Sequence, residues 1–499
     1  MAKVELTTEK RRKLTHEIFV VLLSSPGKSK YELRALLSDK GVIATKSQIN
    51  SVLYGSEPRA WQMEALGAWM NQGRRGVVEA VTGTGKTAVG ILAAADAIAR
   101  QRDVLVLVPG IDLLQQWFDA CTRYLTDDVL IGRFGSGHKD TFKTHNIIIS
   151  TIHSARNNPP TPVCEHGLLI ADEVHRYGTQ QSALALSEMF DERLGLTATY
   201  ERNDDGLEDI LTPYFTPAGK EARPGDEVIV GCDYARGLSD GILAPFRVAT
   251  LGVQFDPAEK ALYATVDNTL RKAKTALIYN HNCPEEPFGS FMQAVRALSD
   301  GGHKDYIGAE IARKYLKAFT DRRKILAGSQ KKMEALIWLK QVIKLSGRTI
   351  VFTETKESAA MAADIFRKIG IPSSNFDSGL KKDARRDLLN QFNAGRIKLL
   401  AAPRVLDEGI DMPEADTGII LTASHSKRQM IQRMGRIIRP KQDGREAKFI
   451  ILYVRNTNED PEFGIHETFL QEMNENAVDM IDFPENVTEK DIIDWCRIT

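Results

Sequence analysis

The chain has 499 residues, which is too long for one hydrophobic core. Hydrophobic residues make up 42% and charged residues 26%, the composition of ordinary globular domains. It has no run of about 18 apolar residues that could span a membrane, and Met1–Glu5 lack the apolar core of a signal peptide. The formal net charge of zero excludes a uniformly basic protein, but a nucleic-acid partner needs only a local positive face.

Residues 1–56 carry ten Lys/Arg against five Asp/Glu and predict short helices separated by a Ser-Pro-Gly turn. An apolar stripe (Leu14, Ile18, Val21, Leu22) precedes the turn, and Lys30–Ser38 and Lys46–Leu53 follow it. A small helix-turn-helix or winged-helix-like module fits this pattern. A helical cap that only packs on the next domain fits it equally well.

Residues 57–240 alternate apolar runs with helical patterns, which indicates a parallel sheet flanked by helices. The predicted strands are Gly76–Val81, Asp103–Val108, Asn146–Ser150, Gly167–Ala171 and Leu194–Thr197. We therefore predict a first α/β lobe here.

Residues 241–455 repeat the alternation and predict a second α/β lobe. Its expected strands are Phe246–Phe255, Thr349–Phe352, Lys398–Ala401, Thr417–Leu421 and Lys448–Val454. A helical stretch at about 258–346, with sixteen Lys/Arg against nine Asp/Glu, interrupts this lobe. Residues 456–499 carry two basic against twelve acidic residues and predict a helical extension packed on the second lobe. A partner-docking or autoinhibitory tail is the alternative.

A phosphate-binding loop is predicted where an apolar strand meets an alanine-rich helix, at Ala80-Val81-Thr82-Gly83-Thr84-Gly85-Lys86-Thr87. The glycines let backbone N–H groups turn toward phosphates, Lys86 reaches the β- and γ-phosphates, and the Thr87 hydroxyl ligates Mg²⁺. Ala80 stands where the general pattern has glycine. The loop therefore predicts ATP and Mg²⁺ as cofactors.

An acidic box, Asp172-Glu173-Val174-His175, ends the predicted strand Gly167–Ala171. Asp172 can hold Mg²⁺, and Glu173 can polarise the attacking water. Either carboxylate alone could be a solvated turn, but the loop and the box in this order indicate nucleotide hydrolysis.

With these motifs the chain resembles superfamily 2 helicases over roughly residues 57–440. Arg59 and Gln62 resemble the adenine-sensing Q motif, Val106–Pro109 with Leu113–Trp117 resembles motif Ia, and Leu196–Thr199 resembles motif III. The resemblance implies two RecA-like lobes. It also implies strand-phosphate contacts at Pro109, Gly135, Ser136 and Thr151.

The second lobe contains Leu406–Pro413, which resembles motif V, and Gln432–Arg439, which resembles motif VI. Two arginines three apart share one helix face and can neutralise charge on a transferring phosphoryl group. The resemblance makes Arg436 and Arg439 these arginine fingers, places Gln432 near the γ-phosphate, and assigns Gly409 and Asp411 to coupling. A basic surface helix is the alternative. Thr353 and Arg404 are further candidate nucleic-acid contacts.

The branch that the chain resembles is that of XPB-type repair helicases, which includes prokaryotic and phage remodelling enzymes. Arg202-Asn203-Asp204 stands where that branch has Arg-Glu-Asp, and it departs from that element because Asn203 lacks the middle carboxylate. The basic insertion corresponds to the branch's thumb-like element. Within it we expect Arg313, Lys314, Arg322 and Arg323 to face nucleic acid, as Arg202 would, and Tyr315 and Phe319 to be core.

Together these patterns predict an ATP-dependent DNA helicase or translocase that unwinds or remodels duplex or branched DNA. The alternatives are tracking along duplex without strand separation, and a nucleic-acid-binding switch gated by ATP. No nuclease motif is present, so a cutting role would need a partner nuclease or another pathway protein. Five widely spaced cysteines indicate reduced thiols, so we expect a cytoplasmic protein, prokaryotic or phage-encoded, with no membrane partner.

Overall fold

The protein is described by a computed structural model that covers residues 17, 21, 30–42, 58–125, 129–301, 305–377, 379–403, 415–421, 434–435, 437–441, 443–463 and 467–497. Its contacts divide the chain into two compact units, Met1–Asp233 and Tyr234–Thr499. The division falls slightly before the predicted boundary at 240/241. Among the described residues no helix is long and apolar enough to cross a membrane.

Unit 1 is built on a sheet with the order β4-β3-β5-β2-β6-β7-β1-β8. Every neighbouring pair is parallel except β3 and β4. The strands are β1 (Arg75–Glu79), β2 (Asp103–Val108), β3 (Ile131–Gly135), β4 (His138–Lys139), β5 (Ile147–Thr151), β6 (Gly167–Asp172), β7 (Glu192–Thr197) and β8 (Val228–Val230). The strands β2, β5, β6 and β7 are buried on both faces, which explains their continuous apolar runs.

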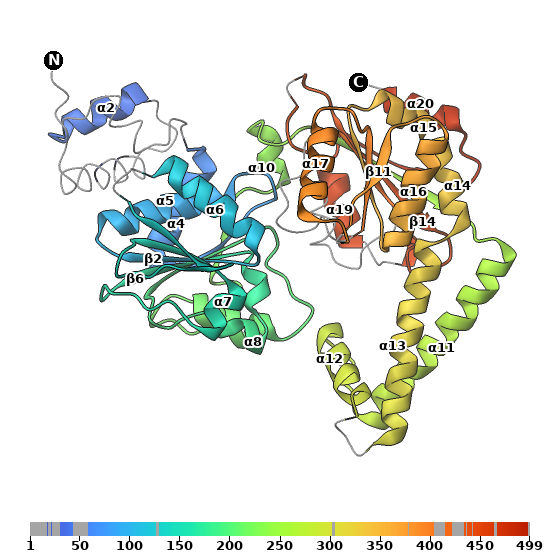
Figure 1. The fold of residues 1–499 in the computed structure, drawn as a ribbon, viewed down its shortest axis with the longest axis horizontal. Coiled ribbons are helices and arrows are strands. Elements are labelled where there is room, and N and C mark those ends of the chain that lie inside the picture. Colours follow the sequence, from blue (N-terminus) through green and yellow to red (C-terminus); the bar gives the residue numbers. More distant parts are fainter. Residues whose placement is uncertain are drawn as a thin grey trace. The chain divides into compact units, whose positions relative to one another are not determined.

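Helices cover both faces of this sheet, with α4, α5 and α6 on one side and α7 and α8 on the other (Figure 1). The helices are α2 (Lys30–Asp39), α4 (Ala60–Asn71), α5 (Lys86–Ala99), α6 (Ile111–Tyr124), α7 (Ile152–Asn157), α8 (Gln180–Ala183) and α9 (Thr212–Phe215). A 3₁₀ turn at Val174–Tyr177 and a π turn at Leu207–Leu211 complete the unit. Of the predicted N-terminal module only α2 and a few neighbours are described, so its class stays a prediction.

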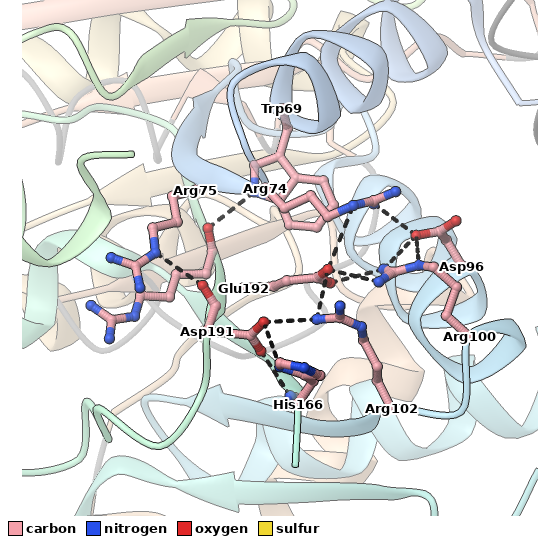
Figure 2. A network of polar contacts seen from close by, with 11 residues as sticks. Trp69, Arg74, Arg75, Asp96, Arg100, Arg102, His166, Asp191 and Glu192 are labelled. Atoms are coloured by element: carbon pink, nitrogen blue, oxygen red, sulfur yellow. Dashed lines mark hydrogen bonds and ion pairs between the residues drawn. The ribbon is translucent and has the colours of Figure 1, made fainter. Parts of the chain in front are cut away.

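An ion-pair network ties together the amino ends of the strands, opposite the predicted motifs (Figure 2). Glu192, at the start of β7, is almost fully buried and accepts bonds from Arg100 at 2.7 and 2.8 Å. Arg102 lies 2.9 Å from the same carboxylate, and Arg74 pairs with Asp96 at 2.8 Å. The network connects helix α5 to strands β1 and β7.

We expect Glu192→Gln to lower the free energy of unfolding by about 2 kcal/mol, because the neutral amide loses the charge-assisted hydrogen bonds that the buried carboxylate accepts from half-buried arginines. Chemical denaturation monitored by circular dichroism measures this. The control is Glu165→Gln, which changes an exposed carboxylate and should leave stability unchanged. Equal stability of both variants would show that the network does not stabilise unit 1.

Unit 2 is built on a second parallel sheet with the order β11-β12-β10-β13-β14-β9-β15. The strands are β9 (Phe246–Val253), β10 (Thr349–Phe352), β11 (Ser373–Asn375), β12 (Leu399–Ala402), β13 (Thr417–Ile420), β14 (Ala447–Val454) and β15 (Asp479–Phe483). The helices are α10 (Tyr234–Ser239), α11 (Pro257–His281), α12 (Phe288–Ser299), α13 (Tyr306–Ala327), α14 (Gln330–Trp338), α15 (Lys340–Leu345), α16 (Lys356–Lys368), α17 (Lys382–Asn393), α19 (Glu467–Asn476) and α20 (Glu489–Arg497). The predicted fold class of two parallel-sheet lobes is confirmed.

The predicted helical insertion is confirmed, and we call its helices α11, α12 and α13 the thumb. Figure 1 shows α11 and α13 running out from the sheet, with α12 beside their far part. The two long helices are antiparallel, since Asp267 pairs with Arg322 near one end and His281 with Asp305 near the other. The thumb has its own core, which includes Leu277, Phe291, Val295 and Tyr315.

The acidic extension is an integral part of unit 2. The expected helices are present as α19 and α20, and a strand that we did not predict, β15, pairs with β9 at the sheet edge. Trp495 of α20 donates to Asp479 at 2.8 Å and packs against Phe483. Deleting residues 456–499 would therefore remove a strand from the sheet as well as a tail.

Candidate functional site

The phosphate loop lies between β1 and α5, at the carboxyl edge of the sheet. Gly83 and Gly85 have φ angles of +87° and +98°, which β-carbon-bearing residues rarely adopt. A β-carbon on Gly85 would also stand 2.8 Å from the Gln62 amide nitrogen. Thr84 is buried, and its hydroxyl donates to the Val81 carbonyl at 2.6 Å. The sequence thus folds here into a tight turn that opens a long helix.

Lys86 is the first residue of α5, and its Nζ donates to the Ala80 carbonyl at 2.7 Å. Removal from water lowers the pKa of Lys86, while the carboxylates of Glu173 and Asp172 oppose that shift. A bound polyphosphate adds negative charge at the same place, so it favours the charged ammonium further. This geometry fits the predicted phosphate contact.

Asp172 ends β6 and is 8% exposed. Its Oδ2 accepts from the indole Nε1 of Trp117 at 2.7 Å, and its Oδ1 accepts from the Glu173 backbone N–H at 3.0 Å. Burial raises the pKa of Asp172, whereas the Trp117 bond and the Lys86 charge lower it. The carboxylate is therefore oriented by a side chain of α6, the motif Ia helix.

Glu173 and His175 connect the acidic box to motif III. Glu173 has a φ of +50°, a left-handed conformation that is uncommon for glutamate. Its Oε2 lies 3.5 Å from the His175 Nδ1, which is 3.1 Å from the Thr197 hydroxyl. That hydroxyl donates to the Thr199 carbonyl at 2.8 Å. A chain of polar contacts thus joins the ends of β6 and β7.

Arg59 and Gln62 form one wall of a cavity of about 530 Å³ beside the phosphate loop. The Gln62 amide donates to the Gly85 carbonyl at 3.0 Å and accepts from the Arg59 backbone N–H at 2.9 Å. The Arg59 guanidinium donates to the Thr84 carbonyl. Thr87 and Trp117 line the same cavity, whereas Thr82 and Gly83 do not. The pair braces the phosphate loop, and adenine recognition by it stays a prediction.

The residues of unit 1 that we predict to contact a nucleic-acid strand lie at the same carboxyl edge of the sheet as the phosphate loop and the acidic box. Pro109 follows β2, Gly135 ends β3 and is followed by Ser136, and Thr151 ends β5. Gly135 packs so closely on α7 that a β-carbon would lie 2.4 Å from the Ser154 hydroxyl. The Thr151 hydroxyl caps α7 by accepting from the Ser154 backbone N–H at 3.3 Å. The structure thus brings both predicted sets together on one edge.

Arg202 lies inside unit 1. Its guanidinium pairs with Asp204 through bonds of 2.6 and 2.5 Å and donates to the His175 carbonyl. Only 10% of the side chain is exposed. A nucleic-acid contact for Arg202 stays a prediction, and it would require these bonds to break. In the observed arrangement the residue braces the acidic box.

The second-lobe candidates fall into two groups. The first group lies outside the described residues, so the roles of its members stay predictions: Arg404, Gly409, Asp411, Gln432 and Arg436. Arg439 is described and half-buried, and the Thr353 hydroxyl is buried and donates to the Thr355 carbonyl at 3.1 Å.

On the thumb, Arg313 and Lys314 are exposed, and their contact with nucleic acid stays a prediction. Arg322 instead pairs with Asp267 at 2.8 Å, and Arg323 pairs with Glu354. Tyr315 is 2% exposed, which confirms that it is core, and it stacks on Phe319, which is partly buried against the same cluster. Exposed cations therefore occupy only part of the predicted basic face.

Trp117 is the residue whose role sequence reasoning missed. Its spacing with Leu114 and Cys121 predicts a buried helix face, and all three residues are buried. That spacing contains no signal for the bond to Asp172, which is 55 residues away.

Comparison with known proteins agrees with this arrangement. Residues 55–202 match the family described as "Type III restriction enzyme, res subunit", and residues 331–441 match "Helicase conserved C-terminal domain". The DNA 3'-5' translocase XPB2 of Sulfurisphaera tokodaii is 30% identical over 404 residues, which cover 80% of this chain and 82% of that protein. The DNA 3'-5' helicase XPB of Kineococcus radiotolerans is 25% identical over 423 residues, which cover 83% of this chain and 63% of that protein.

The fold is similar to that of a Saccharomyces cerevisiae Dbp5 variant solved with RNA and ADP–BeF3. The TM-score is 0.54 at 14% identity, over 95% of this chain and 98% of that one. Two RecA-like lobes, with a phosphate loop and an acidic box at one sheet edge, define an ATP-dependent helicase of superfamily 2. Within that superfamily the chain belongs to the XPB-like DNA helicases and translocases, as its 30% identity to the S. tokodaii protein shows.

Proposed function

We propose that this protein couples ATP hydrolysis to 3'-5' movement on DNA and thereby unwinds or remodels duplex or branched DNA. The observation that carries the proposal is the shared carboxyl edge of unit 1. There the Asp172–Trp117 bond ties the acidic box to the helix that begins just after Pro109. Binding of a DNA strand at Pro109 and Thr151 would therefore change the positions of the residues that hydrolyse ATP. The similarity to a DNA 3'-5' translocase and a DNA 3'-5' helicase supports this direction of movement.

The residues present fit a magnesium ion bound with ATP. Thr87 supplies a hydroxyl and Asp172 a carboxylate, which are the hard oxygen ligands that Mg²⁺ prefers alongside phosphate oxygens. When bound, the ion would neutralise charge on the β- and γ-phosphates. Glu173 would orient the attacking water, and Lys86 would hold the phosphates.

Steady-state ATP hydrolysis tests the proposal. We compare no nucleic acid, single-stranded DNA, blunt duplex, forked DNA and RNA, with Lys86→Ala as the blank. Strong stimulation by DNA that is lost in the variant supports the motor, and displacement of strands with 3' or 5' tails then reads the polarity. Duplex stimulation without displacement identifies a duplex-tracking translocase. No stimulation by any nucleic acid contradicts the proposal and favours an ATP-gated switch.

We expect Trp117→Phe to raise the Mg²⁺ concentration for half-maximal ATPase activity by about tenfold, because outer-shell partners of metal ligands contribute 10- to 100-fold. Phenylalanine retains most of the buried surface but cannot donate to Asp172. A Mg²⁺ titration at saturating ATP measures the shift.

The matched control is Trp69→Phe. Trp69 is also fully buried in unit 1, and its indole donates to the Arg193 carbonyl at 3.0 Å. This variant loses a comparable bond far from Asp172, so its Mg²⁺ requirement should match that of the wild type. Equal shifts in both variants would mean that Trp117 contributes only to packing.

A further inference from the structure

A second cavity, of about 500 Å³, lies in unit 2 at the root of the thumb. Gln254 and Phe255, which follow β9, form one side, and residues 455–458, which follow β14, form another. Helix α11 closes it from the thumb. The cavity thus lies outside the carboxyl ends of two neighbouring parallel strands, the position where α/β sheets bind ligands.

The lining of this thumb-root pocket is strongly positive. It contains four cations and one carboxylate: Lys260, Arg271, Arg322, Arg455 and Asp267. Both oxygens of Asp267 are already engaged, Oδ2 by Arg271 at 2.7 Å and Oδ1 by Arg322 at 2.8 Å. The remaining positive charge favours an anion in the pocket.

Two guanidinium groups of the pocket have donors left over. The Nε atoms of Arg322 and Arg455 are buried and have no hydrogen-bond partner within the described part of the chain. These atoms have no exposed surface, so an acceptor in the cavity reaches them only if the side chain turns toward it. Such a turn would remove the cost of leaving a buried donor without a partner. Arginine forks suit the oxygens of phosphate in particular.

The pocket also has an aromatic wall. The rings of Phe255 and Tyr263 lie 5.4 Å apart, and Phe463 lines the pocket with 60% of its surface exposed. The Tyr263 hydroxyl is held in place, since it donates to the Asn458 side chain at 3.0 Å and accepts from the Asn458 N–H at 3.1 Å. Tyr263 is buried and Phe255 half-buried, so Phe463 supplies the exposed aromatic face. An exposed aromatic face beside cations suits a planar base attached to a phosphate.

We propose that the thumb-root pocket binds one nucleotide, with its phosphate on the exposed cations Lys260 and Arg271 and its base on Phe463, separately from the ATP site of unit 1. A base attached to a phosphate can come from two sources, a nucleotide unit of a nucleic-acid strand or a free nucleotide. A strand at this position would be held where the thumb joins the sheet. The inference goes beyond the proposed motor and does not require ATP turnover.

Photo-crosslinking of the full-length protein tests this site. One probe is a short oligothymidylate carrying 4-thiothymidine, and the other is 8-azido-AMP, each followed by peptide mapping. We expect crosslinks in the peptides around residues 254–263 or 455–463. Crosslinking by the oligonucleotide alone identifies a strand as the source, and competition by AMP identifies a free nucleotide.

The charge requirement is tested with Lys260→Ala/Arg271→Ala, which removes two exposed cations of the pocket. We expect binding at the pocket to weaken about tenfold, as the loss of charge-assisted contacts implies. The matched control is Arg367→Ala/Lys368→Ala on α16. Lys368 pairs with Asp364 one turn away, just as Arg271 pairs with Asp267.

Two results would overturn the inference. One is equal weakening by both double variants, which would indicate general attraction of anions. The other is that neither probe crosslinks to the pocket in protein whose ATPase activity is still stimulated by DNA. A protein whose ATPase ignores DNA but whose pocket crosslinks would instead contradict only the proposed function.

Discussion

Glu173→Gln should leave ATP binding nearly unchanged and reduce ATP turnover by about 10²- to 10⁴-fold, the usual contribution of a general base. The amide has the same shape as the carboxylate, so the left-handed backbone at residue 173 and the contacts of His175 with Thr197 are preserved. The amide cannot take a proton from water. Single-turnover hydrolysis, with nucleotide affinity measured separately, distinguishes the two effects.

The control for this variant is Glu208→Gln, which changes an exposed carboxylate of the π turn. Its turnover should equal that of the wild type. If Glu173→Gln also retained turnover, another group would activate the water. If it abolished nucleotide binding instead, Glu173 would be needed to hold the phosphate loop.

Lys86→Ala should reduce turnover by at least about 10²-fold, in the range seen when one preorganised donor to a developing charge is removed. It should also weaken ATP binding, because the variant loses the only charged group that the loop itself contributes. The Ala80 carbonyl would lose its partner as well. Initial rates over a range of ATP concentrations separate the change in kcat from the change in KM.

Lys220→Ala, at an exposed position of unit 1, serves as the charge-matched control. Thermal unfolding of both variants shows whether the loop still folds. Normal turnover by a folded Lys86→Ala protein would contradict the assignment of the phosphate loop.

The parts of the fold that the sequence predicts are those buried on both faces. β2, β5, β6 and β7 are uninterrupted apolar runs, because central parallel strands meet helices on either side. β15 was missed because Asp479 and Asp482 interrupt it. Those carboxylates are partners of Arg247 and Thr250 on the neighbouring strand, and pairing across such a sequence distance leaves no local pattern.

The candidate site shows the same limit. Lys86, Asp172 and Glu173 were predicted because each belongs to a short motif with its own chemistry. The bond from Trp117 to Asp172 depends on how α6 packs against β6, so the motifs do not contain it. The sequence predicts Arg322 to be an exposed cation of a basic helix, yet the antiparallel helices of the thumb place it opposite Asp267. Local spacing predicts a residue's type of role, whereas its partner is decided by tertiary packing.

The pairing of β9 with β14 sets an order in which the two units can form. Phe246 pairs with Ala447 and Val253 with Val454, so β9 has no neighbour until nearly all of unit 2 has been synthesised. The strands of unit 1, by contrast, are complete at Val230. We therefore expect unit 1 to fold on the ribosome first. Meanwhile β9 stays unpaired and exposes an apolar strand until β14 has been synthesised.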